Sequence, residues 1–409
     1  MENEKSFDLK HIPIHRTTHK SYRGRTIADI CVGMGGFTIA TRWLGMVPIV
    51  AVDIWDKAET TYKKNFPKVP FIRGDILEEK TITDLAAKIR TAEGLDLLCA
   101  GPPCQGFSQM QNGRHRRNDP RNEITRGLAK VLKATRPRAF VIENVPQLFI
   151  YKKGKFARSV LASLRRPTPG LSYKIAANIY DAAVLGVPQQ RRRALIIGVQ
   201  VGEGEVHPPD LPSLSWYFTA RRRGKKINGY SSEIDKILGD PNDDRLVNVS
   251  QAFGDLPILS AGASEVERKY RHPPNTAYQK FIRGNRNKVT ATATPCIKKK
   301  TAKRIRALGP GECVKDLPQH LVGNLGRKFA SAYRRLHSEV PATTLFTKFD
   351  CAFHPTAVRA LSVREYARLQ SIPDWYRFSL SARHSYAMIG NAVPPLMVAR
   401  ILLLALTLD

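Results

Sequence analysis

The sequence has few acidic residues for its length. Asp and Glu total 35 against 66 Lys and Arg, which gives the 409-residue chain a formal net charge of +31. A folded chain this basic repels itself unless it meets a polyanion, so nucleic acid is the favoured partner. No apolar run approaches the roughly 20 residues of a membrane span, which argues against an anionic membrane as the partner. The N-terminus has no apolar signal-peptide core, so we expect a cytoplasmic, nucleoid-associated protein.

Cysteines are also few, and the spacing between them indicates neither a metal site nor disulfide bonds. No two have the C-x-x-C spacing of a zinc site, and no disulfide framework is indicated. His11, His15 and His19 lie four apart, but no acidic or Cys ligand accompanies them, so we expect no metal site. A reducing compartment follows, in which a thiol can act as a nucleophile. The six cysteines are Cys31, Cys99, Cys104, Cys296, Cys313 and Cys351.

The regular part of the sequence begins after a basic arm at residues 1–22. Residues 23–200 alternate short, β-branched apolar runs with longer amphipathic stretches. This alternation predicts an α/β fold, with a doubly wound, mostly parallel sheet and helices on both faces. The expected strands are TIADICVG, MVPIVAVDI, LDLLCAG, RAFVIENV and ALIIGV.

The second half of the chain is less regular. Residues 201–328 are rich in Pro, Gly and Asn and carry basic clusters at 221–226 and 298–300, which predicts a smaller irregular domain. Residues 329–409 regain periodic patterns. There, Ser362 and Glu365 form the capping-box pattern of a helix start, and the final apolar segment predicts a buried helix too short to span a membrane.

Four short motifs carry chemistry, and each follows an expected strand. The first runs from Asp29 to Phe37 and contains Gly33, Gly35 and Gly36, which permit a tight turn and close approach of a ligand. Asp53 ends the next strand, twenty residues after Gly33, where an acid can accept hydrogen bonds from ribose hydroxyls. A third acid, Asp75, follows another strand and could reach an adenine amino group. Alone, this pattern fits a structural glycine turn equally well.

The second motif contains the candidate nucleophile. Cys104 follows the expected strand LDLLCA in the segment Gly101-Pro102-Pro103-Cys104. Prolines stiffen the turn, and the basic loop 112–117 that follows favours the reactive thiolate. A lone cysteine is more often inert filler.

The third and fourth motifs supply an acid and two arginines. Glu143 ends the strand AFVI, and a carboxyl group held by an apolar strand can stay protonated and donate a proton. Arg191 and Arg193 lie at alternate positions before ALIIG, so both can point to one side of an extended segment. The structural alternatives are a salt-bridged Glu and a solvated basic run.

Taken together, the order D-x-x-x-G-x-G-G-F, P-C-Q, E-N-V and Q-x-R-x-R resembles the DNA (cytosine-5)-methyltransferase family. Residues 334–336 with 341–344 are similar to its ninth motif, and residues 386–395 to its tenth. The resemblance covers about 23–200 and 329–400, leaving 201–328 where that family keeps its target-recognition domain. It implies that 23–200 form the catalytic and cofactor-binding domain and that 329–409 return to that domain.

The resemblance implies a Rossmann-like fold that binds S-adenosylmethionine and methylates double-stranded DNA, as a restriction-modification or orphan enzyme. Cys104 would attack carbon 6 of a flipped cytosine, Glu143 would contact N3 and the exocyclic amine, and Arg193 would bond the O2 atom. Arg191 would support the site or a phosphate. A monomer is expected, with a restriction endonuclease as a functional but not a physical partner. The implied cofactor-binding residues are Asp29, Gly33, Gly35, Gly36, Phe37, Asp53, Ile54, Asp75, Ile76, Gly101, Pro103, Asn391 and Ala392.

Three positions depart from the family's pattern. Cys31 stands where the family usually has Phe, Ile54 where an aromatic residue is frequent, and Asp53 where Glu is commoner. The first two changes remove ring contacts to the cofactor, while the third shortens the reach of the acid.

Three other activities compete with this interpretation. Transfer-RNA methylation by a relative is disfavoured, because the Cys-Phe-Thr signature of those enzymes is absent and 201–328 is long and basic. A catalytically silent DNA-binding protein would have no need of Cys104. Adenine or small-molecule methyltransferases lack the nucleophilic cysteine.

Overall fold

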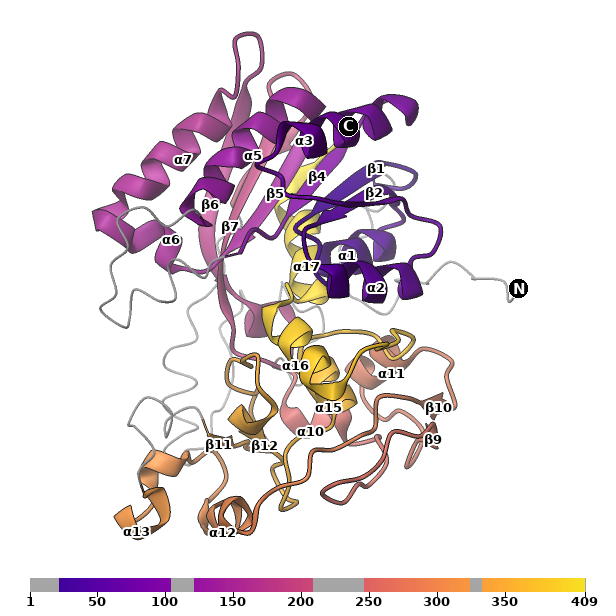
Figure 1. Cartoon of the computed structure of the whole chain (residues 1–409), viewed down its shortest axis with the longest axis vertical. Coiled ribbons are helices and arrows are strands. Elements are labelled where there is room, and N and C mark those ends of the chain that lie inside the picture. Colours follow the sequence, from indigo (N-terminus) through magenta and orange to yellow (C-terminus); the bar gives the residue numbers. More distant parts are fainter. Residues whose placement is uncertain (1–21, 104–120, 209–245, 324–332, 409) are drawn as a thin grey trace. The chain divides into compact units, whose positions relative to one another are not determined.

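The computed structural model describes residues 22–103, 121–208, 246–323 and 333–408 (Figure 1). The chain forms two compact units. The first comprises residues 1–181, 192–210 and 395–409, and the second comprises 182–191 and 211–394. Residues 182–191 and the described part of 329–394 thus pack within the second unit, although their sequence patterns group them with the catalytic domain.

The first unit is built on a seven-stranded sheet in the order β3-β2-β1-β4-β5-β7-β6. Only β7 runs antiparallel to its neighbours β5 and β6, so the predicted mostly parallel sheet is confirmed. The strands are β1 (Thr26–Ile30), β2 (Val47–Asp53), β3 (Phe71–Arg73), β4 (Leu97–Ala100), β5 (Ala139–Asn144), β6 (Tyr173–Asp181) and β7 (Arg192–Gln200). Their apolar residues form the core with the covering helices.

In the part of the first unit that the structure describes, six α-helices connect these strands, and a seventh comes from the last residues described. Figure 1 shows the connecting helices α1 (Gly36–Trp43), α2 (Asp56–Asn65), α3 (Glu79–Thr91), α5 (Arg121–Thr135), α6 (Gln147–Ile150) and α7 (Lys155–Arg165). The seventh, α17 (Pro395–Ala405), packs against α1.

The predicted final helix is buried, but it continues a longer helical stretch. Nine of the 11 residues of α17 are buried. The final helix was expected to be too short to span a membrane. The stretch Ala382–Ala405, however, is long and apolar enough to cross one by length and composition alone. Because most of that stretch is buried, it has the character of a core helix. After α17, β13 (Leu406–Thr407) pairs with β8 (Glu205–Val206) within the same unit.

Short elements make up the second unit, as the weak periodicity of its sequence predicts. Its longer helices are α10 (Val249–Phe253), α11 (Ala277–Arg283), α12 (Lys299–Ala307), α15 (Val363–Leu369) and α16 (Ala382–Asn391). The four-residue helix α13 (Gln319–Val322) and the two-residue strands β9 (Arg268–Lys269), β10 (Lys288–Val289), β11 (Arg334–Arg335) and β12 (Ala352–Phe353) complete it. The capping box of α15 is confirmed: the Ser362 side chain accepts from the Glu365 N–H, and the Glu365 side chain accepts from the Ser362 N–H.

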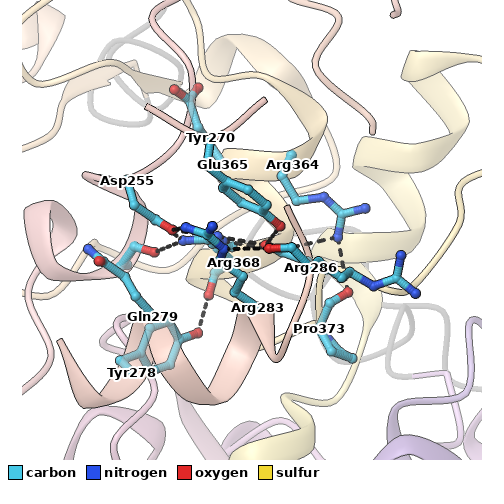
Figure 2. A network of polar contacts seen from close by, with 12 residues as sticks. Asp255, Tyr270, Tyr278, Gln279, Arg283, Arg286, Arg364, Glu365, Arg368 and Pro373 are labelled. Atoms are coloured by element: carbon cyan, nitrogen blue, oxygen red, sulfur yellow. Dashed lines mark hydrogen bonds and ion pairs between the residues drawn. The ribbon is translucent and has the colours of Figure 1, made fainter. Parts of the chain in front are cut away.

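A buried network of charged residues joins α10, α11 and α15 (Figure 2). Arg368 on α15 donates to Asp374 through Nη2 (2.6 Å) and Nε (3.0 Å) and also pairs with Asp255. Arg283 reaches Asp255 at 3.3 Å, and its guanidinium lies 3.7 Å from the centre of the Tyr270 ring. The side chains of Arg368, Asp255 and Asp374 are all fully buried. The network therefore holds α10, α11 and α15 to one another.

Candidate active site

The glycine-rich turn after β1 adopts the conformation that its sequence predicts. Gly33 and Gly35 have positive φ values of 55° and 86°. The space beside Gly33 is open, since nothing lies within 4 Å of an added Cβ, whereas a Cβ at Gly35 would come 2.9 Å from the Phe66 ring. Gly36 begins α1, and Phe37 beside it is buried. The turn therefore leaves its backbone at Gly33 accessible to a ligand.

Asp29 serves the turn from inside the protein. Its Oδ2 accepts hydrogen bonds from the N–H and the hydroxyl of Thr38, at 3.0 and 2.8 Å. Gly35 has no side chain to cap α1, so Asp29 provides the missing acceptor in the first turn of that helix. Burial raises the pKa of Asp29 to about 8, although the bonds from Thr38 oppose the shift. Asp29 is fully buried, so its role here is to hold the turn.

Asp53 connects the end of β2 to the same turn. Its Oδ2 accepts from the Gly33 N–H at 2.8 Å and its Oδ1 from the Trp55 N–H at 2.9 Å. Burial raises the pKa of Asp53, and these backbone N–H groups oppose the rise. Each carboxylate oxygen can accept further bonds, so the acid can still receive ribose hydroxyls. Ile54 beside it is 67% exposed, which leaves an apolar surface available to a flat ring.

The third acid lies after β3. Asp75 is half-buried, and its Oδ1 accepts from the Leu77 N–H at 2.9 Å. Ile76 beside it is buried in the core of the sheet. Asp53 and Asp75 thus follow paired parallel strands, β2 and β3, at the same edge of the sheet.

The register of β4 and β5 defines where the candidate nucleophile leaves the sheet. The strands are parallel and Ala100, the last residue of β4, pairs with Ile142, so Gly101 leaves the sheet beside Glu143, which is still within β5. Gly101 is half-buried and Pro103 is exposed. Cys104 and the basic loop after it lie outside the described residues.

Glu143 and Arg193 meet at this edge. Arg193 Nε lies 2.7 Å from Glu143 Oε1, and both side chains are mostly buried, at 13% and 12% exposure. Arg193 also donates from Nη1 to the Arg192 carbonyl. The antiparallel neighbours β5 and β7 bring the two residues together from 50 positions apart in sequence. The structure therefore brings together the predicted acid and one of the two predicted arginines.

Arg191 lies in the second unit and has different partners. It is 1% exposed, and its guanidinium donates to the carbonyls of Leu345 (3.2 Å), Gly390 (2.7 Å) and Ala392 (3.3 Å). These contacts tie the Q-x-R motif to the segments that carry the ninth and tenth motifs. Its support of the site and its contact with a phosphate both stay predictions.

Gln189 makes similar contacts, and we call the hydrogen bonds of Arg191 and Gln189 to the backbone of Leu345, Leu369, Gly390 and Ala392 the clamp. It is fully buried and donates to the Leu369 carbonyl, while its Oε1 accepts from the Leu345 N–H. Gly390 lies so close to the neighbouring backbone that a Cβ there would come 2.2 Å from the Phe346 carbonyl oxygen. Asn391 and Ala392 follow in the second unit, and their part in cofactor binding stays a prediction.

Sequence reasoning missed two buried residues of these motifs. Gln189 lies in the quoted Q-x-R-x-R pattern but was given no role, although an amide two residues before a buried arginine is a typical partner. Asn144 is 2% exposed, and its Oδ1 accepts from the Val145 N–H. Its position directly after Glu143 was the available signal.

The fold is that of a Rossmann-like α/β enzyme, and the candidate residues Glu143 and Arg193 lie at the carboxyl edge of its sheet. The chain belongs to the C-5 cytosine-specific DNA methylase family, whose model matches residues 25–403. It is thus a DNA (cytosine-5)-methyltransferase, and the predicted family is confirmed.

The relatives of this chain include two bacterial modification enzymes. The Type II methyltransferase M.AgeI of Thalassovita gelatinovora is 30% identical, over 90% of this chain and 96% of its own length. The Type II methyltransferase M1.HphI of Haemophilus parahaemolyticus is 29% identical, over 92% of this chain and 85% of its own.

A solved structure supports the fold. A protein described as a DNA modification methyltransferase encoded within a prophage (E. coli) superposes with a TM-score of 0.67 at 24% identity. It covers 93% of this chain and 98% of its own. At that identity the likeness concerns the fold alone.

Proposed function

We propose that this enzyme transfers a methyl group from S-adenosylmethionine to carbon 5 of a cytosine flipped out of duplex DNA, with Cys104 as the covalent nucleophile. The observation that carries the proposal is the Glu143–Arg193 ion pair, 2.7 Å long, at the edge where the chain leaves β4 toward Cys104. An acid, an arginine and a cysteine nucleophile are the side chains that addition to a cytosine ring requires.

The turn after β1 fits the cofactor. The open space beside Gly33 admits a ligand to the backbone, Asp53 and Asp75 offer carboxylates, and exposed Ile54 can pack on adenine. When bound there, S-adenosylmethionine supplies an electrophilic methyl group. The absence of an aromatic ring at Cys31 leaves Ile54 as the apolar contact.

Cys104, Glu143 and Arg193 then have separate roles in the reaction. The Cys104 thiolate forms a bond to carbon 6 of the cytosine, which makes carbon 5 nucleophilic. Glu143 holds the proton at N3 while carbon 6 is attacked, and Arg193 donates to O2. An arginine has five N–H donors, so Arg193 can hold Glu143 and the base together. Once carbon 5 is methylated, its proton leaves to solvent base and the bond to Cys104 breaks.

The second unit provides a DNA surface on and around α12. Lys298, Lys299, Lys300, Lys303 and Arg306 are exposed, and none pairs with an acid within the described residues. The helix is supported by a small core of its own, which includes Ile305 and Leu308. Such a surface has the charge that DNA phosphates require.

The likeness to M.AgeI and M1.HphI supports a modification role, with a restriction endonuclease as the functional partner. We propose a monomer that acts where DNA lies in the cytoplasm.

Trapping on 5-fluorocytosine tests the chemistry, because fluorine at carbon 5 blocks the release of the enzyme. Wild type is incubated with S-adenosylmethionine and a duplex library that contains the analogue. A denaturant-resistant adduct is expected from wild type and from the control Cys296→Ala, whose thiol is exposed in the second unit, but not from Cys104→Ala. An adduct that persists in Cys104→Ala contradicts the proposal, as does trapping on RNA in place of DNA.

A further inference from the structure

The turn between α6 and α7 has an unusual backbone. Lys152 and Lys153 have φ values of 49° and 53°, and Gly154 follows at 78°. The two lysines are the one pair of neighbouring non-glycine residues with positive φ in the described part of the chain. Side chains with a Cβ rarely adopt this conformation, and it persists where the surrounding structure enforces it, often at functional sites.

Several contacts hold this turn, residues 151–154, in place. The Tyr151 ring packs against Phe156 of α7, with 6.0 Å between ring centres. The Lys152 ammonium lies 5.4 Å from the centre of the Tyr151 ring, and Arg158 donates to the Lys153 carbonyl at 3.4 Å. Because the turn is anchored to α7, its two lysines lose little freedom when they bind a partner.

The charge around the turn is of one sign. No Asp or Glu occurs between Glu143 and Asp181, a stretch that contains seven Lys and Arg. Lys152, Lys153 and Lys155 are exposed, and none of them pairs with an acid within the described residues. The fold supplies no counter-charge here, which favours a polyanionic partner.

The turn also lies at the catalytic edge of the sheet. Lys152 comes eight residues after Asn144, the last residue of β5. The helix α7 then runs back toward the opposite edge, where β6 begins parallel to β5. Glu143, Arg193 and the two lysines therefore belong to the same edge of the first unit.

We propose that Lys152 and Lys153 contact two phosphates of the duplex whose cytosine enters the site, and so hold the DNA backbone against the catalytic edge. This deepens the proposed function and rests on it. The contacts would be independent of base sequence, since an ammonium group recognises a phosphate by charge.

The test measures the affinity for duplex DNA over a range of KCl concentrations. The double variant Lys152→Gln/Lys153→Gln is compared with wild type and with Arg165→Gln/Arg166→Gln. The control pair is exposed and removes the same charge from the far end of α7.

Each lost phosphate contact reduces the slope of log K against log salt by about 0.9. We therefore expect a slope about 1.8 smaller for the lysine variant, and a wild-type slope for the control. Lys152→Arg/Lys153→Arg should restore the wild-type slope.

Each unfavourable outcome of this test overturns a different claim. A wild-type slope in the lysine variant, or an equal loss in the arginine control, overturns the role of the turn and leaves the proposed function intact if methyl transfer persists. A slope change with duplex RNA but not with DNA overturns the choice of DNA as the partner. A wild type that neither binds nor methylates DNA overturns the proposed function together with this inference.

Discussion

Arg193 and Glu143 form an ion pair, with Arg193 Nε 2.7 Å from Glu143 Oε1, although they come from antiparallel strands of the sheet. The preceding residue, Arg192, begins β7 and is exposed. Within the described residues, Arg193 therefore pairs with an acid and its neighbour Arg192 does not, which gives the site a matched control.

The first prediction concerns this pair. Arg193→Ala should lower the single-turnover rate of methyl transfer by about 100-fold or more, because Glu143 loses its partner and the base loses a donor. Arg192→Ala should retain activity close to wild type. Equal rates for the two variants would show that the ion pair does not serve the reaction.

The second prediction separates Arg191 from Arg193. Arg191→Ala leaves the buried carbonyls of Leu345 and Gly390 without their donor, whereas the Ala392 carbonyl keeps the bond from Gln370, and each unmet group costs about 1–3 kcal/mol. We expect urea unfolding to show a loss of at least about 2 kcal/mol for the two unmet carbonyls. Arg193→Ala leaves fewer buried backbone groups without a partner and should lose less. An Arg191→Ala variant as stable as wild type would contradict the clamp.

The parallel part of the sheet was predictable because its strands are buried on both faces. β4 and β5 are entirely buried, and their sequences are apolar throughout β4 and as far as Ile142 in β5. Strand β6 was not foreseen, because it lies at the edge of the sheet and mixes buried and exposed residues within YKIAANIYD. Its pairing with β7 depends on contacts that no local pattern records.

The site was predictable as far as short motifs reach. The position of Glu143 and Arg193 at strand ends followed from sequence, but their contact depends on an antiparallel pairing that the periodicity does not reveal. The alternation of Arg191 and Arg193 suggested one shared target, whereas burial gives Arg191 carbonyl partners of its own. Spacing cannot tell a buried arginine from an exposed one.

The third prediction concerns pH. The pKa of Asp29 is raised to about 8 in the folded protein from a usual value near 3.8, so the folded state holds its proton more tightly than the unfolded state. This stability is fully present below the unfolded pKa and is lost as the pH rises toward 8. Asp29→Asn keeps an acceptor for Thr38 without the charge. It should therefore be more stable than wild type at pH 9, by a margin that shrinks as the pH falls.

Thermal unfolding between pH 5 and 9 measures this effect. The control is Asp84→Asn, which removes an exposed carboxylate from α3 and should follow the wild-type curve. A pH-independent difference between Asp29→Asn and wild type would show that Asp29 is not the titrating group.

The last prediction concerns the buried network of Figure 2. Burial alone would raise the pKa of Asp374, but Arg368 and Arg364 hold it below its usual value. Arg368→Met removes the main partner and leaves two buried carboxylates, which costs about 3–5 kcal/mol at pH 7. The stability supplied by a lowered pKa is present above the unfolded pKa and is lost as the pH falls through the folded one. The cost of the substitution should therefore shrink at acid pH, where the carboxylates of the variant are protonated.

Urea unfolding at pH 7 and pH 5 measures both values, and Arg383→Met, at an exposed position on α16, should cost less than about 0.5 kcal/mol. A cost for Arg368→Met that is the same at both pH values would mean that packing, not charge, makes Arg368 necessary.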